Sequence, residues 1–109
     1  FFIDYAEKAR AVSQAPLIIT GGFRSQNAME DALASGHLDL VGVARPFALV
    51  PDLANKMQNG TYQTVQTDRI QTGVALVDKK AGAMLEMNWY MTQMDLIGQG
   101  KRPNPKLSA

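Results

Sequence analysis

The spacing of apolar residues predicts short strands alternating with helices along most of the chain. Apolar side chains recur at helical spacing between residues 2 and 12, and charged ones take the other face, which indicates a helix that ends before Pro16. Residues 17–20 and 38–43 are apolar runs without alternation, as in parallel strands that are covered on both faces. A helix of about ten residues fits between them and suits a parallel crossover.

Start and stop signals flank the predicted helices. Ser25 or Asn27 can cap the helix between the strands, Asn27 with Glu30 loosely matches a capping box, and Gly36 is expected to end it. Pro46 suits the first position of a short helix that follows the second strand. The predicted inner faces are Phe2, Tyr5, Ala6, Ala9 and Val12 in the first helix, and Met29, Ala32 and Leu33 in the second.

The second half of the chain is predicted to be mainly helical. A helix from Asp52 to Asn59-Gly60 precedes a polar surface loop over residues 61–72, which contains the charge pair Asp68 and Arg69. Helical spacing resumes at Val74, and Gly82 is expected to break this segment before a longer helix over residues 83–97. Trp89 and Tyr90 could form a stacking platform, but on a helix rich in methionine they are expected to pack against the exterior of a barrel. Residues 98–109 are expected to form an extended tail.

The candidate chemistry lies where the two strands end. The first run stops at Thr20-Gly21-Gly22 and the second at Ala44-Arg45-Pro46, so both turns fall at the same end of a parallel pair. Such turns can present backbone N–H groups to one phosphate, with helix N-termini aimed the same way. In (β/α)₈ barrels, phosphate sites are often built from the loops after strands 7 and 8. The pattern therefore predicts a phosphate-binding corner.

These residues also resemble a known family, the old yellow enzyme-type, FMN-dependent NADH:flavin oxidoreductases. The resemblance is carried by Thr20-Gly21-Gly22-Phe23-Arg24, Ala28-Met29-Glu30, Asp39-Leu40-Val41-Gly42-Val43-Ala44-Arg45-Pro46 and Trp89-Tyr90-x-x-Gln93. It implies an α/β fold, namely the C-terminal part of a (β/α)₈ TIM barrel with helix, strand 7, helix, strand 8 and C-terminal helices. Residues 1–109 would form a single C-terminal fragment of that FMN-binding domain.

The resemblance also assigns site residues. Its implied FMN contacts are Gly21, Gly22 and Phe23 at the first turn and Gly42, Ala44 and Arg45 at the second. Many relatives have glycine where this chain has Ala44. It implies no catalytic residue here, because the groups that hold the flavin ring and donate the proton lie on earlier strands. The whole protein would pass hydride from NAD(P)H through FMN to a small electrophilic acceptor such as an activated alkene.

Several residues keep two interpretations. Arg45 contacts the phosphate or pairs with a carboxylate, Arg24 is a ligand or faces solvent, and Phe23 contacts the flavin or fills the core. Asp39, at the opposite end of the strands, is expected to cap backbone groups, and His37 beside it is not expected to act in catalysis. Arg102 belongs to a solvated tail or reaches a partner subunit's site.

Composition narrows the classes of function. The chain has 109 residues, 46% of them hydrophobic and 19% charged, and a net charge of +1, which gives no sign of a nucleic-acid or anionic membrane partner. It has no cysteine, which fits a cytoplasmic protein, and no cluster with metal-ligand spacing. The chain begins at Phe1, within an expected helix, so we interpret it as a fragment whose open strand edges favour self-association. Two alternatives are a non-flavin barrel enzyme that binds a phosphorylated substrate and a catalytically inert, self-associating fragment.

Overall fold

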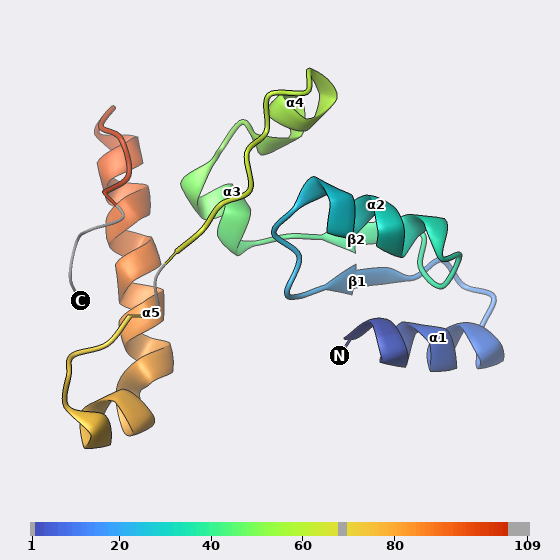
Figure 1. Cartoon of the computed structure of the whole chain (residues 1–109), viewed down its shortest axis with the longest axis horizontal. Coiled ribbons are helices and arrows are strands. Elements are labelled where there is room, and N and C mark those ends of the chain that lie inside the picture. Colours follow the sequence, from blue (N-terminus) through green and yellow to red (C-terminus); the bar gives the residue numbers. More distant parts are fainter. Residues whose placement is uncertain (1, 68–69, 105–109) are drawn as a thin grey trace. The chain divides into compact units, whose positions relative to one another are not determined.

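The computed structural model describes residues 2–67 and 70–104, in which helices and short strands follow one another in a mixed α/β order. Figure 1 shows the elements in chain order. They are α1 (Phe2–Val12), β1 (Ile18–Thr20), α2 (Gln26–Ala34), β2 (Leu40–Gly42), α3 (Arg45–Leu49), α4 (Leu53–Gln58) and α5 (Ala75–Gly98). One compact unit comprises the chain through Phe47 together with residues 52–65, and a second comprises residues 48–51 and the chain from residue 66 onward.

The two strands form the predicted parallel pair. Ile18 lies opposite Leu40 and Thr20 opposite Gly42, so both strands end together at the glycine turns. Both strands are three residues long and shorter than the apolar runs that predicted them. In the first unit α1 packs on β1 and α2 packs on β2, and Figure 1 shows α2 as the crossover between the strands.

The core of the first unit is small. It contains Ala6, Phe23, Met29, Ala32 and Leu38. The predicted inner face of α1 is wrong in part, because Phe2, Tyr5 and Val12 are 53%, 69% and 87% exposed. Leu33 of α2 is also exposed. A sheet of two strands is only about 10 Å wide, which leaves too little apolar surface to cover either helix completely.

The ends of α2 resolve the choice between two caps. Ser25 is the N-cap, and its hydroxyl oxygen accepts a hydrogen bond from the Ala28 amide at 3.2 Å. The expected capping box of Asn27 with Glu30 is wrong, since Asn27 lies inside the helix and Glu30 instead accepts a hydrogen bond from the Gln26 side chain. Gly36 follows the helix with a φ of +77°, as expected for a C′ glycine.

Two short helices follow the second strand. Helix α3 begins at Arg45, one residue before the Pro46 start that the sequence predicts. Helix α4 has Asp52 at its N-cap and a buried Leu53, and Gly60 follows its end with a φ of +75°. Residues 61–67 and 70–72 form no helix or strand, in agreement with the predicted loop, whereas Asp68 and Arg69 lie outside the described residues.

Helix α5 dominates the second unit. It is continuous from Ala75 to Gly98, so the predicted break at Gly82 is wrong. Trp89 and Tyr90 are buried, with their rings edge to face at a centroid distance of 5.0 Å. Their packing against a barrel exterior stays a prediction. The described part of the tail returns to the helix, because the buried amide of Gln93 exchanges two hydrogen bonds with the main chain of Asn104. No helix within the described ranges combines the length and apolarity that crossing a membrane requires.

Candidate functional site

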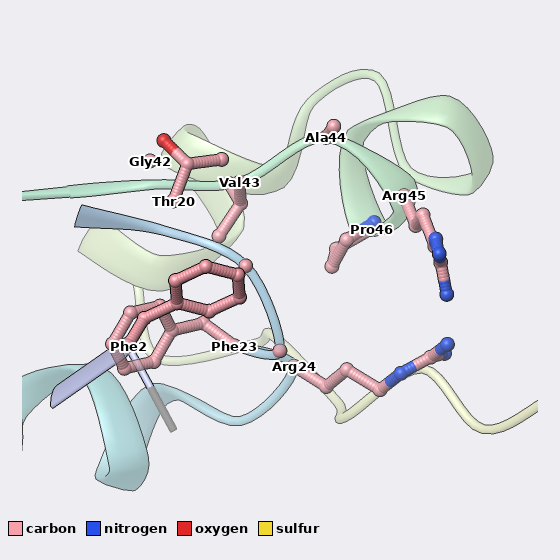
Figure 2. Close-up of a pocket in the computed structure, with 11 residues that line it drawn as sticks. Phe2, Thr20, Phe23, Arg24, Gly42, Val43, Ala44, Arg45 and Pro46 are labelled. Atoms are coloured by element: carbon pink, nitrogen blue, oxygen red, sulfur yellow. The ribbon is translucent and has the colours of Figure 1, made fainter. Parts of the chain in front are cut away.

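A pocket of about 340 Å³ opens at the end of the strands where both turns lie. All six residues that the sequence predicts as FMN contacts line it, as do Thr20, Arg24 and Phe2 (Figure 2). The six come from two segments about twenty positions apart, and they meet because the parallel register ends Thr20 beside Gly42. The sequence therefore identified residues that the fold does bring together.

The first turn depends on two glycines. Gly21 and Gly22 have φ values of +127° and +79°, a backbone conformation that residues with a side chain rarely adopt. A Cβ atom on Gly21 would also come within 2.8 Å of the Phe2 ring, whereas one on Gly22 would meet open space. Phe2 therefore covers one side of the turn and leaves the Gly22 side open.

The second turn is tight for a different reason. Gly42 has no unusual backbone angle, but a Cβ atom there would overlap the hydroxyl of Thr20 and approach its Cβ at 3.0 Å. The Thr20 side chain thus lies against the bare backbone of Gly42, as Figure 2 shows. Ala44 is exposed beyond it, and Arg45 begins α3. Gly42 therefore contributes close packing of the strands beside the pocket.

The main-chain amides of the two turns are the groups that could donate hydrogen bonds to a bound anion. None of the turn and cap hydrogen bonds that join main-chain groups of the described residues is donated by Gly22 or Ala44. Both residues are exposed and line the same pocket. Backbone N–H groups presented in this way from turns are the usual donors to phosphate oxygens.

Phe23 fills the core, which is one of its two interpretations, whereas its contact with the flavin stays a prediction. Its side chain is 7% exposed and belongs to the core of the first unit, yet it also lines the pocket. It therefore anchors the first turn to the core while its ring forms part of the pocket wall.

The described part of the pocket wall carries two basic side chains. Arg24 and Arg45 are the ionisable side chains among its described lining residues, which include no carboxylate. Figure 2 shows the two guanidinium groups extending toward one another from opposite turns. Arginine holds its charge at any physiological pH and matches phosphate oxygens in geometry. Sequence reasoning left Arg24 undecided, and the fold places it at the same opening as Arg45.

The opposite end of the strands has a structural role. The Asp39 carboxylate accepts a hydrogen bond from the Leu17 amide at 2.8 Å and pairs with Arg10 at 2.5 Å. The Leu17 hydrogen bond, followed by that of Arg10, holds the pKa of Asp39 below its ordinary value of 3.8. The prediction that Asp39 caps backbone groups is confirmed, and neither it nor His37 lines the pocket. In the described ranges no group of acidic, histidine or cysteine side chains is arranged to hold a metal ion.

Sequence reasoning missed two residues that contact the first turn of the pocket. Phe2 lies against Gly21, and the hydroxyl of Tyr62 donates a hydrogen bond to the carbonyl of Arg24 at 2.5 Å. Both act across long separations in sequence, and neither belongs to a short motif. Only the fold reveals them.

The chain is similar to known flavin oxidoreductases. A family model described as NADH:flavin oxidoreductase / NADH oxidase matches residues 3–64, more than half of the chain. The chain is 38% identical over 98 residues to the "NADH-dependent flavin oxidoreductase iliE" of Neonectria sp. (strain DH2). The matched segment covers 88% of this chain and 12% of that protein. It is 46% identical over 52 residues to the "NADH-dependent flavin oxidoreductase iccE" of Talaromyces variabilis, covering 47% of this chain and 13% of that protein. The chain thus spans about an eighth of the length of these relatives.

Proposed function

Because the chain belongs to the NADH:flavin oxidoreductase / NADH oxidase family, we propose that it is the part of an FMN-dependent NADH oxidoreductase that binds the phosphate of FMN. The observation that supports this most strongly is the pocket in which the two predicted turns meet. The family supports the resemblance to old yellow enzyme-type proteins and FMN as the cofactor. It also favours a flavin enzyme over a non-flavin barrel enzyme with a phosphorylated substrate.

The fold supports the proposal that this chain is the C-terminal part of a barrel. A parallel pair joined by a helix is the repeating unit of a (β/α)₈ barrel, and β1 and β2 are one such pair. We assign them to strands 7 and 8, because the pocket lies at their C-terminal ends and a short helix, α3, begins beside it. Phosphate sites of such barrels are frequently formed by the loops after these two strands.

The residues of this chain would bind the phosphate of FMN and orient the cofactor. FMN supplies the hydride chemistry when bound. The amides of Gly22 and Ala44 would donate hydrogen bonds to the phosphate, and Arg45 would add a charge-assisted contact. Fixing the phosphate in a rigid corner sets where the rest of the cofactor lies, which is how such an anchor contributes to catalysis.

The pocket does not provide a proton donor for reduction of an acceptor. Its ionisable lining residues within the described chain are Arg24 and Arg45, and a guanidinium is too weak an acid to serve as a proton donor. We therefore propose that the 109-residue chain alone has no turnover, and that the protein containing it reduces an activated alkene or a related acceptor with NADH. The acceptor class rests on the resemblance to ene-reductases of the old yellow enzyme type.

Flavin binding and NADH oxidation test the proposal separately. Titration of the chain with FMN and with riboflavin, followed by flavin fluorescence, should show tighter binding of FMN, because riboflavin lacks only the phosphate. NADH oxidation by the chain with FMN should not exceed the rate with free FMN. Equal affinity for the two flavins would contradict the phosphate anchor, and clear turnover would contradict the inactive fragment.

A further inference from the structure

Helix α5 carries an exposed apolar stripe along one side. Together with the exposed Lys80, its members follow one another at alternating spacings of three and four residues. Their side chains are between 41% and 61% exposed. We call this set the methionine stripe, and its members are Val77, Met84, Met87, Met91 and Met94. Alternating spacings of three and four are the pattern by which two helices pack along a common seam.

The opposite face of α5 is covered by the chain itself. Trp89 and Gln93 are buried on that face, and the Gln93 amide exchanges two hydrogen bonds with the main chain of Asn104. The methionine stripe is therefore a second apolar face, about half a turn around the helix from the first. A helix that is apolar on two faces requires contacts on both, and a contiguous exposed apolar surface is typical of an interaction site.

The methionine stripe has opposite charges at its two ends. Lys80 precedes the methionines, and Asp95 follows directly after Met94; both charged residues are exposed. A second copy of α5 that runs antiparallel, with Met84 opposite Met94, would bring Lys80 within about one helical turn of Asp95 of the other copy. By symmetry this charge pair would form twice. Lys80 would also lie near the C-terminal end of the other helix, where a cation is stabilising.

Other arrangements match these charges less well. A parallel second copy would place Lys80 beside Lys80 and Asp95 beside Asp95, and like charges repel. A stripe that is basic at one end and acidic at the other complements itself when it is reversed, which is the requirement of a symmetric two-fold contact. The unbranched side chain of methionine adapts to the surface that it meets. The charges therefore favour a second copy in antiparallel orientation as the occupant.

We propose that the methionine stripe of α5 is a dimer interface, which binds the same stripe of a second copy of this chain in antiparallel orientation. Met84 of each copy lies against Met94 of the other. In the centre, Met87 lies against Met91. The inference does not rest on the proposed function, because the phosphate pocket is lined by residues of the first unit and α5 belongs to the second.

Disulfide formation tests the orientation directly, because the chain has no cysteine of its own. A mixture of the Met84→Cys and Met94→Cys variants should form a disulfide between the two variants on mild oxidation. Each variant alone should stay unlinked, since its two cysteines would lie about 15 Å apart along the helix axis, beyond the reach of a disulfide. Disulfides within each variant but not between the two variants would show a parallel pair and overturn the proposal.

Charge reversal tests whether the occupant is a second copy. Lys80→Glu should raise the dissociation constant of the dimer about tenfold in sedimentation equilibrium, because both symmetric pairs become repulsive. Asp95→Lys should do the same, and the two changes combined in one chain should restore association. Lys79→Glu makes the same charge change at a neighbouring exposed position outside the stripe and should have little effect.

The apolar part of the interface is tested by Met87→Gln, which keeps the length of the side chain and makes it polar. This change should raise the dissociation constant at least about tenfold, because it acts once in each copy. Val12→Gln is the matched control, since Val12 is an 87% exposed apolar residue of α1 in the first unit. It should leave the dissociation constant unchanged.

Two further results would overturn the inference. If the chain associates but Met87→Gln and the charge reversals have no effect, the copies meet through another surface, such as the open strand edges. If the chain stays monomeric, the methionine stripe is not a dimer interface. A lower free energy of unfolding in monomeric Met87→Gln would then show that the stripe is covered within one copy.

Discussion

Gly21 and Gly22 are adjacent glycines with positive φ, yet their surroundings differ. A side chain at Gly22 would meet open space, whereas one at Gly21 would collide with the Phe2 ring. We expect Gly22→Ala to cost roughly 1–2 kcal/mol from backbone conformation alone. Gly21→Ala should cost more, because Phe2 must also move. Urea unfolding of both variants measures the difference, and an equal loss in the two would contradict the role of Phe2.

Tyr90 buries a hydroxyl for which no hydrogen-bond partner is found among the described residues. Its side chain is 8% exposed, so water replaces that partner poorly. We therefore expect Tyr90→Phe to raise the free energy of unfolding by about 1 kcal/mol. Thermal or urea unfolding measures this, with Tyr5→Phe as an exposed control of the same chemistry. A clear loss of stability in Tyr90→Phe would show that the hydroxyl is satisfied.

At this scale, what the sequence could predict depended on how local the cause is. The sequence placed Gly21, Gly22 and Arg45 at one pocket, because a phosphate-binding turn is expected to need glycine and to favour arginine, and both appear within a few positions. Their contact with a phosphate stays a prediction. Phe2 and Tyr62 could not be identified. Their roles arise from contacts with residues about twenty and 38 positions away, which no local pattern encodes.

At the scale of the elements, the carboxylate of Asp39 stabilises the end of the strand pair at which both strands begin. Asp39 accepts hydrogen bonds from the Leu17 amide and from Arg10, so its pKa is lower in the folded chain than in the unfolded one. Its stabilising contribution is therefore complete above the unfolded pKa near 3.8 and disappears as the pH falls through the folded pKa.

The resulting prediction concerns acid unfolding. Asp39→Asn should be less stable than the unchanged chain at neutral pH, and the difference should shrink as the pH falls below about 4. Urea unfolding at several pH values measures it. Asp31→Asn, which changes an exposed carboxylate on α2, is the control and should show little difference. A difference that stays constant to the acid limit would contradict the role of the ionised carboxylate.

The elements also show where local rules prevail and where they do not. Ser25 and Gly36 bound α2 as cap chemistry predicts, because capping involves only neighbouring residues. Gly82 was expected to break α5, but one glycine costs a helix interior only about 1 kcal/mol relative to alanine. A helix of 24 residues that buries Trp89, Tyr90 and Gln93 tolerates that cost.

For the whole molecule, the exposed apolar surface is the main observation. Val12, Leu76, Met84, Met87 and Met91 are each more than half exposed. In the described residues the sheet has only two strands, so each has an open edge. We therefore expect the 109-residue chain to self-associate. Sedimentation velocity over a range of concentrations should show species larger than the monomer, and a monomer at every concentration would contradict the expectation.

The order of elements was predictable over most of the chain, since strand and helix periods differ clearly. Which helix faces are buried could not be predicted from the sequence. Side chains placed on an inner face by their spacing, such as Tyr5 and Leu33, are exposed because two strands offer too little surface to cover them. The pocket was predictable because parallel strands bring their C-terminal turns together, and this single rule joins two segments about twenty positions apart.

The central claim is that two strand-end turns bind one phosphate through their main-chain amides. Residue-resolved NMR of the chain during titration with FMN tests it most directly. The account predicts that the amide signals of Gly22 and Ala44 shift together, saturate at the same FMN concentration, and move much less with riboflavin. Amide signals at both positions that stay unchanged with FMN, or that respond equally to riboflavin, would contradict it.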